Sequence, residues 1–442
     1  MMAGTNSGCG KTTVTTAVLS AFQKRSVPLF AYKCGPDYID PMFHRKVLGL
    51  PTENLDLFFS TPEELQKRIA QKAGSLVALE GVMGYFDGIG TEGKVSSYEL
   101  SRAVKTPVVL VMNARGMYTS AGAILKGFRD FRPDSGIRGV IFNGVTAETY
   151  RGLAQIARGE GVEPLGFLPM KKELSVAERH LGLVTAEEIT DLQERIAKWG
   201  ELAEQTVDLD GILKLAETAP ELPDPGMSGT EKRKTSLRIA IARDAAFCFC
   251  YEENLSMLRD AGAELCFFSP LEEKSLPEKI GGLYLPGGYP ELYAEKLSGN
   301  DTLRRQIRDA VQSGLPTIAE CGGFLYLQET LDGRPMTGVL PGKSGKKDRL
   351  QRFGYATLTA KKDCLLGRAG DSFRVHEFHY YDSTRNGSDF TAVKAGDGSS
   401  YDCAAATDTL YAGFPHLYFP ACKQAVVRFV EKGQEYVGRN KI

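Results

Sequence analysis

The chain has 442 residues, too many for one ordinary hydrophobic core, so we expect two or three domains. Its 42% hydrophobic and 25% charged residues are typical of a soluble globular protein, and a net charge of −1 without a basic excess argues against nucleic acid or an anionic membrane as partner. Nothing reaches the ~20 apolar residues of a membrane span or has a signal-peptide layout, and nine cysteines without C-x-x-C pairs suit a reducing cytoplasm.

The segment GTNSGCGKTT at 4–13 predicts a phosphate-binding loop, in which backbone N–H groups surround phosphates, Lys11 reaches their oxygens and the Thr12 hydroxyl holds Mg²⁺. Its spacing has one residue more than the strict G-x-x-x-x-G-K-[ST] pattern and is similar to the dethiobiotin synthetase branch of phosphate-loop proteins. The alternative is a glycine-rich turn capped by Thr12. Only three residues precede the loop, so the strand that normally leads into it is expected to be missing. The predicted nucleotide-binding residues here are Gly4, Thr5, Gly8, Gly10, Lys11, Thr12 and Thr13.

Apolar runs then alternate with helical patterns, which predicts a doubly wound α/β sheet in a domain spanning 1–216. Asn143 ends one of the runs, where its amide could read an adenine edge or form a turn. The predicted strands lie at 75–80, 106–113 and 137–143, and the predicted helices lie at 120–131 and 149–158.

Carboxylates gather at the ends of these strands. Glu80 closes the strand at 75–80, Asp87 follows it on a glycine-flanked loop, and Asp37 and Asp40 lie near Lys33 in the segment 32–44. Each one taken singly is more readily explained as a solvated loop charge. Together, bracketed by Gly and Pro, they predict the carboxylates of a magnesium site.

A polar, proline-rich segment at 217–236 is predicted to link this domain to a second α/β domain at 237–442. The second domain is expected to become richer in strands from about Phe353. Its predicted strands lie at 237–244, 264–268, 281–288 and 315–323, and a helix is predicted at 251–263.

Cys321 is the one cysteine placed as a nucleophile, at a sharp turn from strand to helix. Gly322 and Gly288 could donate backbone N–H groups to an oxyanion. His416 follows the strand 409–414 and is predicted to be the base, although a buried or surface histidine is the usual explanation for any single one. Because the chain has no H-x-E string, a Cys–His dyad without a third member is expected.

These segments together resemble the cobyrinic acid a,c-diamide synthases of corrinoid biosynthesis, along nearly the whole chain. GPDYIDP and HEFHY are the strings specific to that family. The matching strings are AGTNSGCGKTT, KCGPDYIDPMFH, EGVMGYFDG, RHLGL, IARDAAFCF, NLSMLRDAGAEL, FSPL, LYLPGGYPEL, AECGGFLYL and HEFHY.

The resemblance implies an N-terminal domain that uses ATP and Mg²⁺ to phosphorylate a substrate carboxylate. It implies a C-terminal class I glutamine amidotransferase that releases ammonia through a thioester on Cys321, with His416 as base. Ammonia would then convert the a- and c-acetate carboxylates of cobyrinic acid to amides. By this likeness Thr12, Asp37 and Glu80 hold the metal, and carboxylate activation is expected at Lys33, Asp37, Tyr38, Ile39, Asp40 and Asp87.

The chain departs from the family at His416–Tyr418, where members often have H-L-H, and at Asn113, where an acidic residue is expected. Hydrogenobyrinic acid and nickel-sirohydrochlorin remain alternative substrates. A non-catalytic ATP switch with a decayed amidotransferase domain and a stand-alone glutaminase are alternatives of another class. The expected partners are small molecules (a corrinoid, glutamine and ATP), with the chain a monomer or homodimer.

Overall fold

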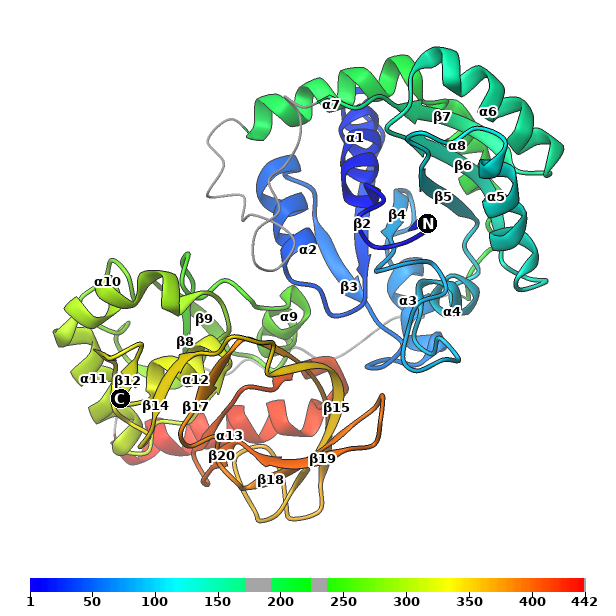
Figure 1. Cartoon of the computed structure of the whole chain (residues 1–442). Coiled ribbons are helices and arrows are strands. Elements are labelled where there is room, and N and C mark those ends of the chain that lie inside the picture. Colours follow the sequence, from blue (N-terminus) through cyan, green and yellow to red (C-terminus); the bar gives the residue numbers. More distant parts are fainter. Residues whose placement is uncertain (172–191, 224–236, 441–442) are drawn as a thin grey trace. The chain divides into compact units, whose positions relative to one another are not determined.

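The computed structural model describes residues 1–171, 192–223 and 237–440 and divides into two compact units, Met1–Ser228 and Gly229–Ile442 (Figure 1). The RHLGL string and residues 224–236 of the expected linker lie outside the described residues. The domain boundaries at 216 and 237 therefore stay predictions. Within the described ranges, no helix combines the length and apolar character needed to span a bilayer.

The first unit is built on a seven-stranded sheet in the order β3-β2-β4-β1-β5-β6-β7, and every pairing in it is parallel. Alternate residues of β5 lie in different cores: Val109 and Val111 pack with α1 and α7, and Leu110 and Met112 pack on the other face. The strands are β1 (Met2–Gly4), β2 (Leu29–Cys34), β3 (Thr52–Leu55), β4 (Leu76–Glu80), β5 (Val108–Asn113), β6 (Ile137–Asn143) and β7 (Glu163–Leu168).

Helices cover both faces of this sheet, which confirms the predicted doubly wound α/β class. Figure 1 shows α1 and α7 lying together on one face. The helices are α1 (Lys11–Lys24), α2 (Ile39–Phe43), the π-helix η1 (His44–Leu48), α3 (Pro62–Ala70), α4 (Ser97–Ala103), α5 (Ser120–Asp130), α6 (Ala147–Gly159), α7 (Leu192–Thr206) and α8 (Leu209–Glu217).

The expectation that no strand leads into the phosphate loop is corrected by β1. Although it has only 3 residues, β1 lies in the interior of the sheet and pairs with β4 on one side and β5 on the other. Gly81 N–H donates to the Met2 carbonyl at 2.8 Å, and Thr5 N–H donates to the Val111 carbonyl at 3.1 Å. A strand hydrogen-bonded on both sides needs few residues to hold its place, and β1 delivers the chain to the loop between its neighbours.

The second unit contains a six-stranded sheet in the order β20-β21-β11-β10-β8-β9, parallel except for β20 at its edge. This confirms the second α/β domain. The strands are β8 (Arg238–Ala242), β9 (Glu264–Phe268), β10 (Ile280–Leu285), β11 (Thr317–Glu320), β20 (Ala405–Ala406) and β21 (Leu410–Gly413). The helices are α9 (Glu252–Asp260), η4 (Pro290–Tyr293), α10 (Ala294–Gly299), α11 (Asp301–Gln312), α12 (Gly322–Leu327), η5 (Phe419–Ala421) and α13 (Lys423–Asn440).

The later part of this unit is rich in strands, as expected. An antiparallel sheet has the order β19-β18-β15-β16-β22, and a small one has the order β13-β12-β14-β17. The strands of the first are β15 (Arg352–Ala360), β16 (Ser372–His379), β18 (Phe390–Lys394), β19 (Ser400–Cys403) and β22 (His416–Leu417). Those of the second are β12 (Thr330–Leu331), β13 (Arg334–Pro335), β14 (Lys343–Lys346) and β17 (Tyr381–Ser383).

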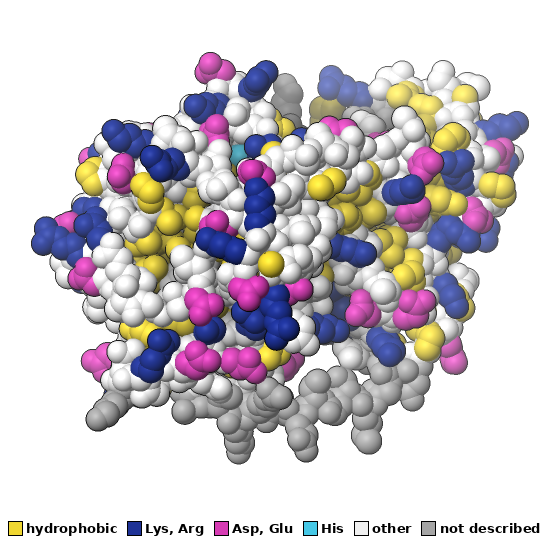
Figure 2. All heavy atoms as spheres, turned by 90° about the horizontal axis from the view of Figure 1, so that it is seen from below, with side chains coloured by type: hydrophobic (Ala, Val, Ile, Leu, Met, Phe, Trp, Pro, Cys, Tyr) yellow, Lys and Arg dark blue, Asp and Glu magenta, His cyan; other side chains and the backbone are white. Residues whose placement is uncertain are grey.

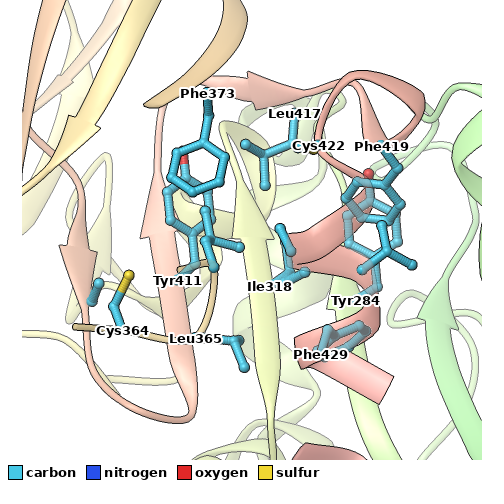
Figure 3. Packing of buried hydrophobic residues seen from close by; sticks show 14 of the residues in the cluster. Tyr284, Ile318, Cys364, Leu365, Phe373, Tyr411, Leu417, Phe419, Cys422 and Phe429 are labelled. Carbon is cyan, nitrogen blue, oxygen red and sulfur yellow. The ribbon is translucent and has the colours of Figure 1, made fainter. Parts of the chain in front are cut away.

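A buried cluster packs against β10 and β11. Figure 3 shows Tyr284 on β10 and Ile318 on β11 among the residues that pack with Phe419 and Phe429. The Tyr284 and Phe419 rings have centroids 5.5 Å apart. This packing fixes the strand end that carries Glu320 and Cys321, because side chains in a close-packed core have little room to shift.

Charged side chains of both signs are interspersed over the face drawn in Figure 2. This pattern agrees with a formal net charge of −1 for the whole chain.

Candidate active sites

The segment between β1 and α1 has the backbone of a phosphate-binding loop. Gly8 and Gly10 have φ angles of 77° and 89°, in the left-handed region that favours glycine, and Gly10 caps the N-terminus of α1. The first N–H groups of a helix have no intrahelical partner, so they are available to an anion. The ammonium group of Lys11 lies near the next loop, 3.5 Å from the Met83 carbonyl oxygen.

Asn143, at the end of β6, contacts this loop directly. Its Nδ2 donates a hydrogen bond to the Cys9 carbonyl oxygen at 3.0 Å. A Cβ added at Gly10 would lie 2.0 Å from the same Nδ2, so only glycine fits there. The amide group expected to read adenine is thus engaged by the loop, which favours a bracing role; adenine recognition stays a prediction.

A buried cluster of charged side chains lies beside the loop. Lys33 on β2 forms ion pairs with Asp40 and, at 3.0 Å, with Glu80 Oε1. The Thr12 hydroxyl donates to Glu80 Oε1 at 2.6 Å and lies 3.3 Å from Asp40 Oδ2. Lys33, Asp40 and Glu80 are all at most 3% exposed. Thr12, Lys33, Asp40 and Glu80 are therefore brought together beside the phosphate loop from separate elements of the first unit.

The other predicted residues of this unit lie around that cluster. Asp37 is nearer the surface, and its Oδ1 accepts the N–H groups of Ile39 and Asp40 at 2.8 and 3.3 Å. Its Oδ2 is 3.9 Å from Lys33 Nζ. Asp87 accepts the Gly84 N–H at 3.1 Å and is exposed. Tyr38 and Thr13 are half-buried, while Ile39 is buried.

His44 was not predicted to belong to this site, yet it lies in it. Its Nε2 is 3.3 Å from Glu80 Oε2, and both side chains are 1% exposed. The string DPMFH contains His44 four residues after Asp40, and the helical turn formed by α2 and η1 brings it to the cluster. That spacing was the available signal, because residues four apart share one face of a helix.

The two carboxylates of the cluster differ in acidity. Burial raises the pKa of Asp40 well above its ordinary value, even though Lys33 lies beside it. Burial would also raise the pKa of Glu80, but Lys33 and His44 hold it well below its ordinary value. Burial alone would lower the pKa of Lys33, but the carboxylates of Asp40 and Glu80 raise it well above its ordinary value.

The oxygen atoms of the cluster fit a magnesium ion. Within the described residues, Asp40 Oδ1 is buried without a hydrogen-bond partner. Mg²⁺ is usually held by one or two carboxylates together with phosphate oxygens and water. Thr12, Asp40 and Glu80 offer that donor set beside the phosphate loop, whereas one oxygen of Asp37 accepts the N–H groups of Ile39 and Asp40.

In the second unit, Cys321 occupies a strained turn between β11 and α12. Its backbone has φ 45° and ψ −100°, a conformation that non-glycine residues rarely adopt and that is common at nucleophilic turns. Its N–H donates to the Gly413 carbonyl oxygen at 2.8 Å. A Cβ added at Gly322 would lie 3.0 Å from the Gly288 nitrogen, so the two predicted oxyanion glycines are neighbours.

His416 on β22 reaches the same turn. It is 3% exposed and lies within hydrogen-bonding reach of Cys321. Burial lowers the pKa of His416, but Cys321 and Glu320 outweigh burial and raise it to about 10. A pKa raised in this way keeps the His416 imidazole protonated near pH 7. Glu320 lies 3.6 Å from His416 Nδ1. The sequence did not predict this contact, because the acid of such a group was expected in an H-x-E string.

Comparison with known families divides the chain in the same way. Residues 1–184 match the CobQ/CobB/MinD/ParA nucleotide binding domain, and residues 238–423 match the CobB/CobQ-like glutamine amidotransferase domain. The first unit therefore carries a nucleotide-binding domain, and the second carries an amidotransferase domain.

Relatives cover most of the chain. A cobyrinate a,c-diamide synthase of Thermoplasma volcanium is 40% identical over 86% of this chain and 84% of that protein. One from Listeria monocytogenes is 39% identical over 86% of each chain, and one from Clostridium acetobutylicum is 36% identical over 95% of this chain and 96% of that protein. The resemblance found in the sequence is confirmed: the chain belongs to the cobyrinate a,c-diamide synthase family.

Proposed function

We propose that this protein uses ATP and glutamine to convert the a- and c-acetate carboxylates of cobyrinic acid to carboxamides, a step in cobalamin biosynthesis. The observation that carries this proposal is the presence in one chain of a phosphate loop beside Lys33, Asp40 and Glu80, and of a Cys321–His416 pair. The substrate is taken from the names of the relatives.

In the first unit, the loop at 4–13 and Lys11 bind the phosphates of ATP. Thr12, Glu80 and Asp40 would hold Mg²⁺, and Asp37 stays a predicted ligand. When bound, Mg²⁺ would neutralise charge on the phosphates. A substrate carboxylate oxygen takes the γ-phosphoryl group, ADP leaves, and the acyl carbon now carries a good leaving group. Lys33 lies where its positive charge would attract that carboxylate.

In the second unit, the Cys321 thiolate attacks the side-chain carboxamide of glutamine. Backbone N–H groups of Gly288 and Gly322 would stabilise the oxyanion. His416 gives its proton to the departing ammonia, then takes one from the water that hydrolyses the thioester to glutamate. Ammonia attacks the acyl phosphate and displaces inorganic phosphate, which leaves the amide. The raised pKa of His416, about 10, supports an imidazole that is protonated near pH 7 and can give its proton to ammonia.

The test is mass spectrometry of cobyrinic acid incubated with the full chain, ATP-Mg²⁺ and glutamine. We expect two carboxylates to become amides, with one ADP formed for each. Hydrogenobyrinic acid and nickel-sirohydrochlorin are assayed in parallel, because they carry comparable acetate side chains. Amidation of one of these alone would replace the proposed substrate. Hydrolysis of glutamine without amidation of any tetrapyrrole would contradict the proposal.

Cytoplasmic location and a monomeric or homodimeric state stay predictions. The non-catalytic alternative is disfavoured by the buried Cys321–His416 pair, because a decayed site has no reason to keep a strained nucleophile turn. A stand-alone glutaminase would leave the ion-paired cluster beside the phosphate loop without a use.

A further inference from the structure

Glu320 immediately precedes Cys321 and faces His416. Both side chains are buried, at 1% and 3% exposure, and His416 Nδ1 lies 3.6 Å from Glu320 Oε2. This separation is an ion-pair distance and slightly longer than a hydrogen bond. In enzymes without substrate, contacts between acid–base groups are often long and tighten when substrate binds.

The carboxylate of Glu320 is held in place from two sides. Its Oε2 accepts the Tyr284 hydroxyl at 3.0 Å, and its Oε1 accepts the Leu417 N–H at 3.1 Å. Leu417 follows His416 on β22, so the carboxylate is tied to the backbone that carries the imidazole. A buried carboxylate fixed in this way cannot turn away from the ring.

We infer that Glu320 is the third member of the glutaminase group and acts as a positioning residue that orients His416 and balances the charge of its protonated ring. The inference rests on the proposed glutaminase reaction of Cys321 and His416. A carboxylate beside the second nitrogen of a catalytic imidazole sets its tautomer and stabilises the imidazolium that forms. The expected Cys–His dyad would thus be a triad whose acid comes from the residue before the nucleophile.

The chain builds this arrangement from two strands. Glu320 ends β11, which pairs with β10 and β21, and the ladder between β16 and β22 sets His416 opposite His376. An H-x-E triad would place acid and base on one strand. Here the acid Glu320 and the nucleophile Cys321 are adjacent in sequence, and the base His416 comes from β22.

Other titratable groups also face this pair. His376 has a pKa lowered to about 3 by burial and by the charge of His416, so it stays neutral near pH 7. Burial raises the pKa of Glu377, and burial lowers that of His379 to about 4. Burial also raises the pKa values of the remaining groups, which keeps them protonated near pH 7: Cys250, Tyr284, Tyr411 and Cys422.

The decisive variant is Glu320→Gln in the full chain. Its amide oxygen can still accept the Leu417 N–H, while the negative charge is lost. We expect kcat for glutamine hydrolysis to fall by roughly 10²-fold or more with little change in KM. Amidation driven by free ammonia should continue, because it does not use Cys321.

A second readout separates positioning from folding. Alkylation of Cys321 by iodoacetamide, followed on its own peptide by mass spectrometry across a pH series, reports the thiolate fraction. Loss of the carboxylate makes the imidazolium–thiolate pair less favourable, so the alkylation midpoint should move to higher pH. The matched control is Glu264→Gln, the same substitution at an exposed carboxylate that pairs with Arg238 on β8, so the midpoint should stay.

Glu320→Asp keeps the charge with a shorter side chain and should recover part of the glutaminase rate lost in Glu320→Gln. The inference is overturned if Glu320→Gln hydrolyses glutamine within about threefold of wild type, or if its alkylation midpoint does not move. It is also overturned if Glu320→Asp is no better than Glu320→Gln. A wild-type chain that hydrolyses no glutamine would instead refute the proposed function itself.

Discussion

Lys33 lies buried between Asp40 and Glu80 and pairs with both, so its removal tests how much these ion pairs stabilise the first unit. Removing one partner of a buried ion pair typically costs about 3–5 kcal/mol, because the remaining charge is left uncompensated. We therefore expect Lys33→Met to lower the free energy of unfolding of the first unit by that order. The only tryptophan of the chain, Trp199, is buried in this unit, so its fluorescence during urea unfolding reports on it alone.

The matched control is Lys24→Met, which breaks the exposed ion pair between α1 and α7. Lys24 and Glu201 have side-chain exposures of 43% and 61%. Exposed pairs contribute about 0–1 kcal/mol, so this variant should barely shift the transition. If both variants lost the same free energy of unfolding, the prediction would be wrong, because the buried ion pairs would then stabilise the unit no more than an exposed pair does.

For single residues, the sequence predicted which side chains belong to a site better than it predicted which side chains they contact. Glu80, Asp40 and Lys33 were singled out because carboxylates at strand ends signal a site, and the structure brings them together. Asp37 fits less well, since its carboxylate accepts the backbone N–H groups of Ile39 and Asp40. The place of Glu320 could not be predicted, because its contact with Leu417 joins residues 97 apart in sequence.

The pairing of β16 with β22 sets two buried histidines opposite each other, with pKa values moved in opposite directions. The pKa of His376 is lowered from 6.5 to about 3, so its neutral form stabilises the fold above pH 6.5 and this contribution is lost as pH falls. The pKa of His416 is raised from 6.5 to about 10, so its contribution is complete below pH 6.5 and lost as pH rises through 10.

Between about pH 7 and pH 5, the His376 contribution should fall by about 2 kcal/mol, while the His416 contribution should rise by less than about 1 kcal/mol. We expect hydrogen exchange of the peptide 372–379, corrected for intrinsic rates, to show less protection at the lower pH. His376→Gln should show a smaller change, because glutamine does not titrate. If the wild type and His376→Gln lost the same protection at low pH, the effect would come from a group other than His376.

Among the strands, the sequence predicted long, buried ones and missed very short ones. The strands β4, β5 and β6 were predicted because strands covered on both faces read as apolar runs. β1 was missed because 3 residues carry no periodicity; its identity as a strand comes from hydrogen bonds to β4 and β5. The strands of the small sheet, such as β12 and β13, have 2 residues each and carry even less local signal.

For the whole molecule, the two units hold separate parts of the proposed reaction. The phosphate loop and its ion-paired cluster lie within the first unit, and Cys321, His416 and Glu320 lie within the second. A change in one chemistry should therefore leave the other measurable. Two single substitutions in the full chain give opposite patterns if this division holds.

In Cys321→Ser the rate of glutamine-dependent amidation should fall by roughly 10³-fold or more, because a serine hydroxyl is a far weaker nucleophile than a cysteine sulfur. It should keep amidation with added ammonium salts, which bypasses the thioester. Glu80→Gln should abolish amidation with either nitrogen source, since ATP can no longer activate the carboxylate, while glutamine hydrolysis continues. Both are measured by amide product and by glutamate release from the same reactions. If Cys321→Ser also loses the ammonia reaction, the two units do not act as separable sites, and the carboxylate cannot be activated by the first unit alone.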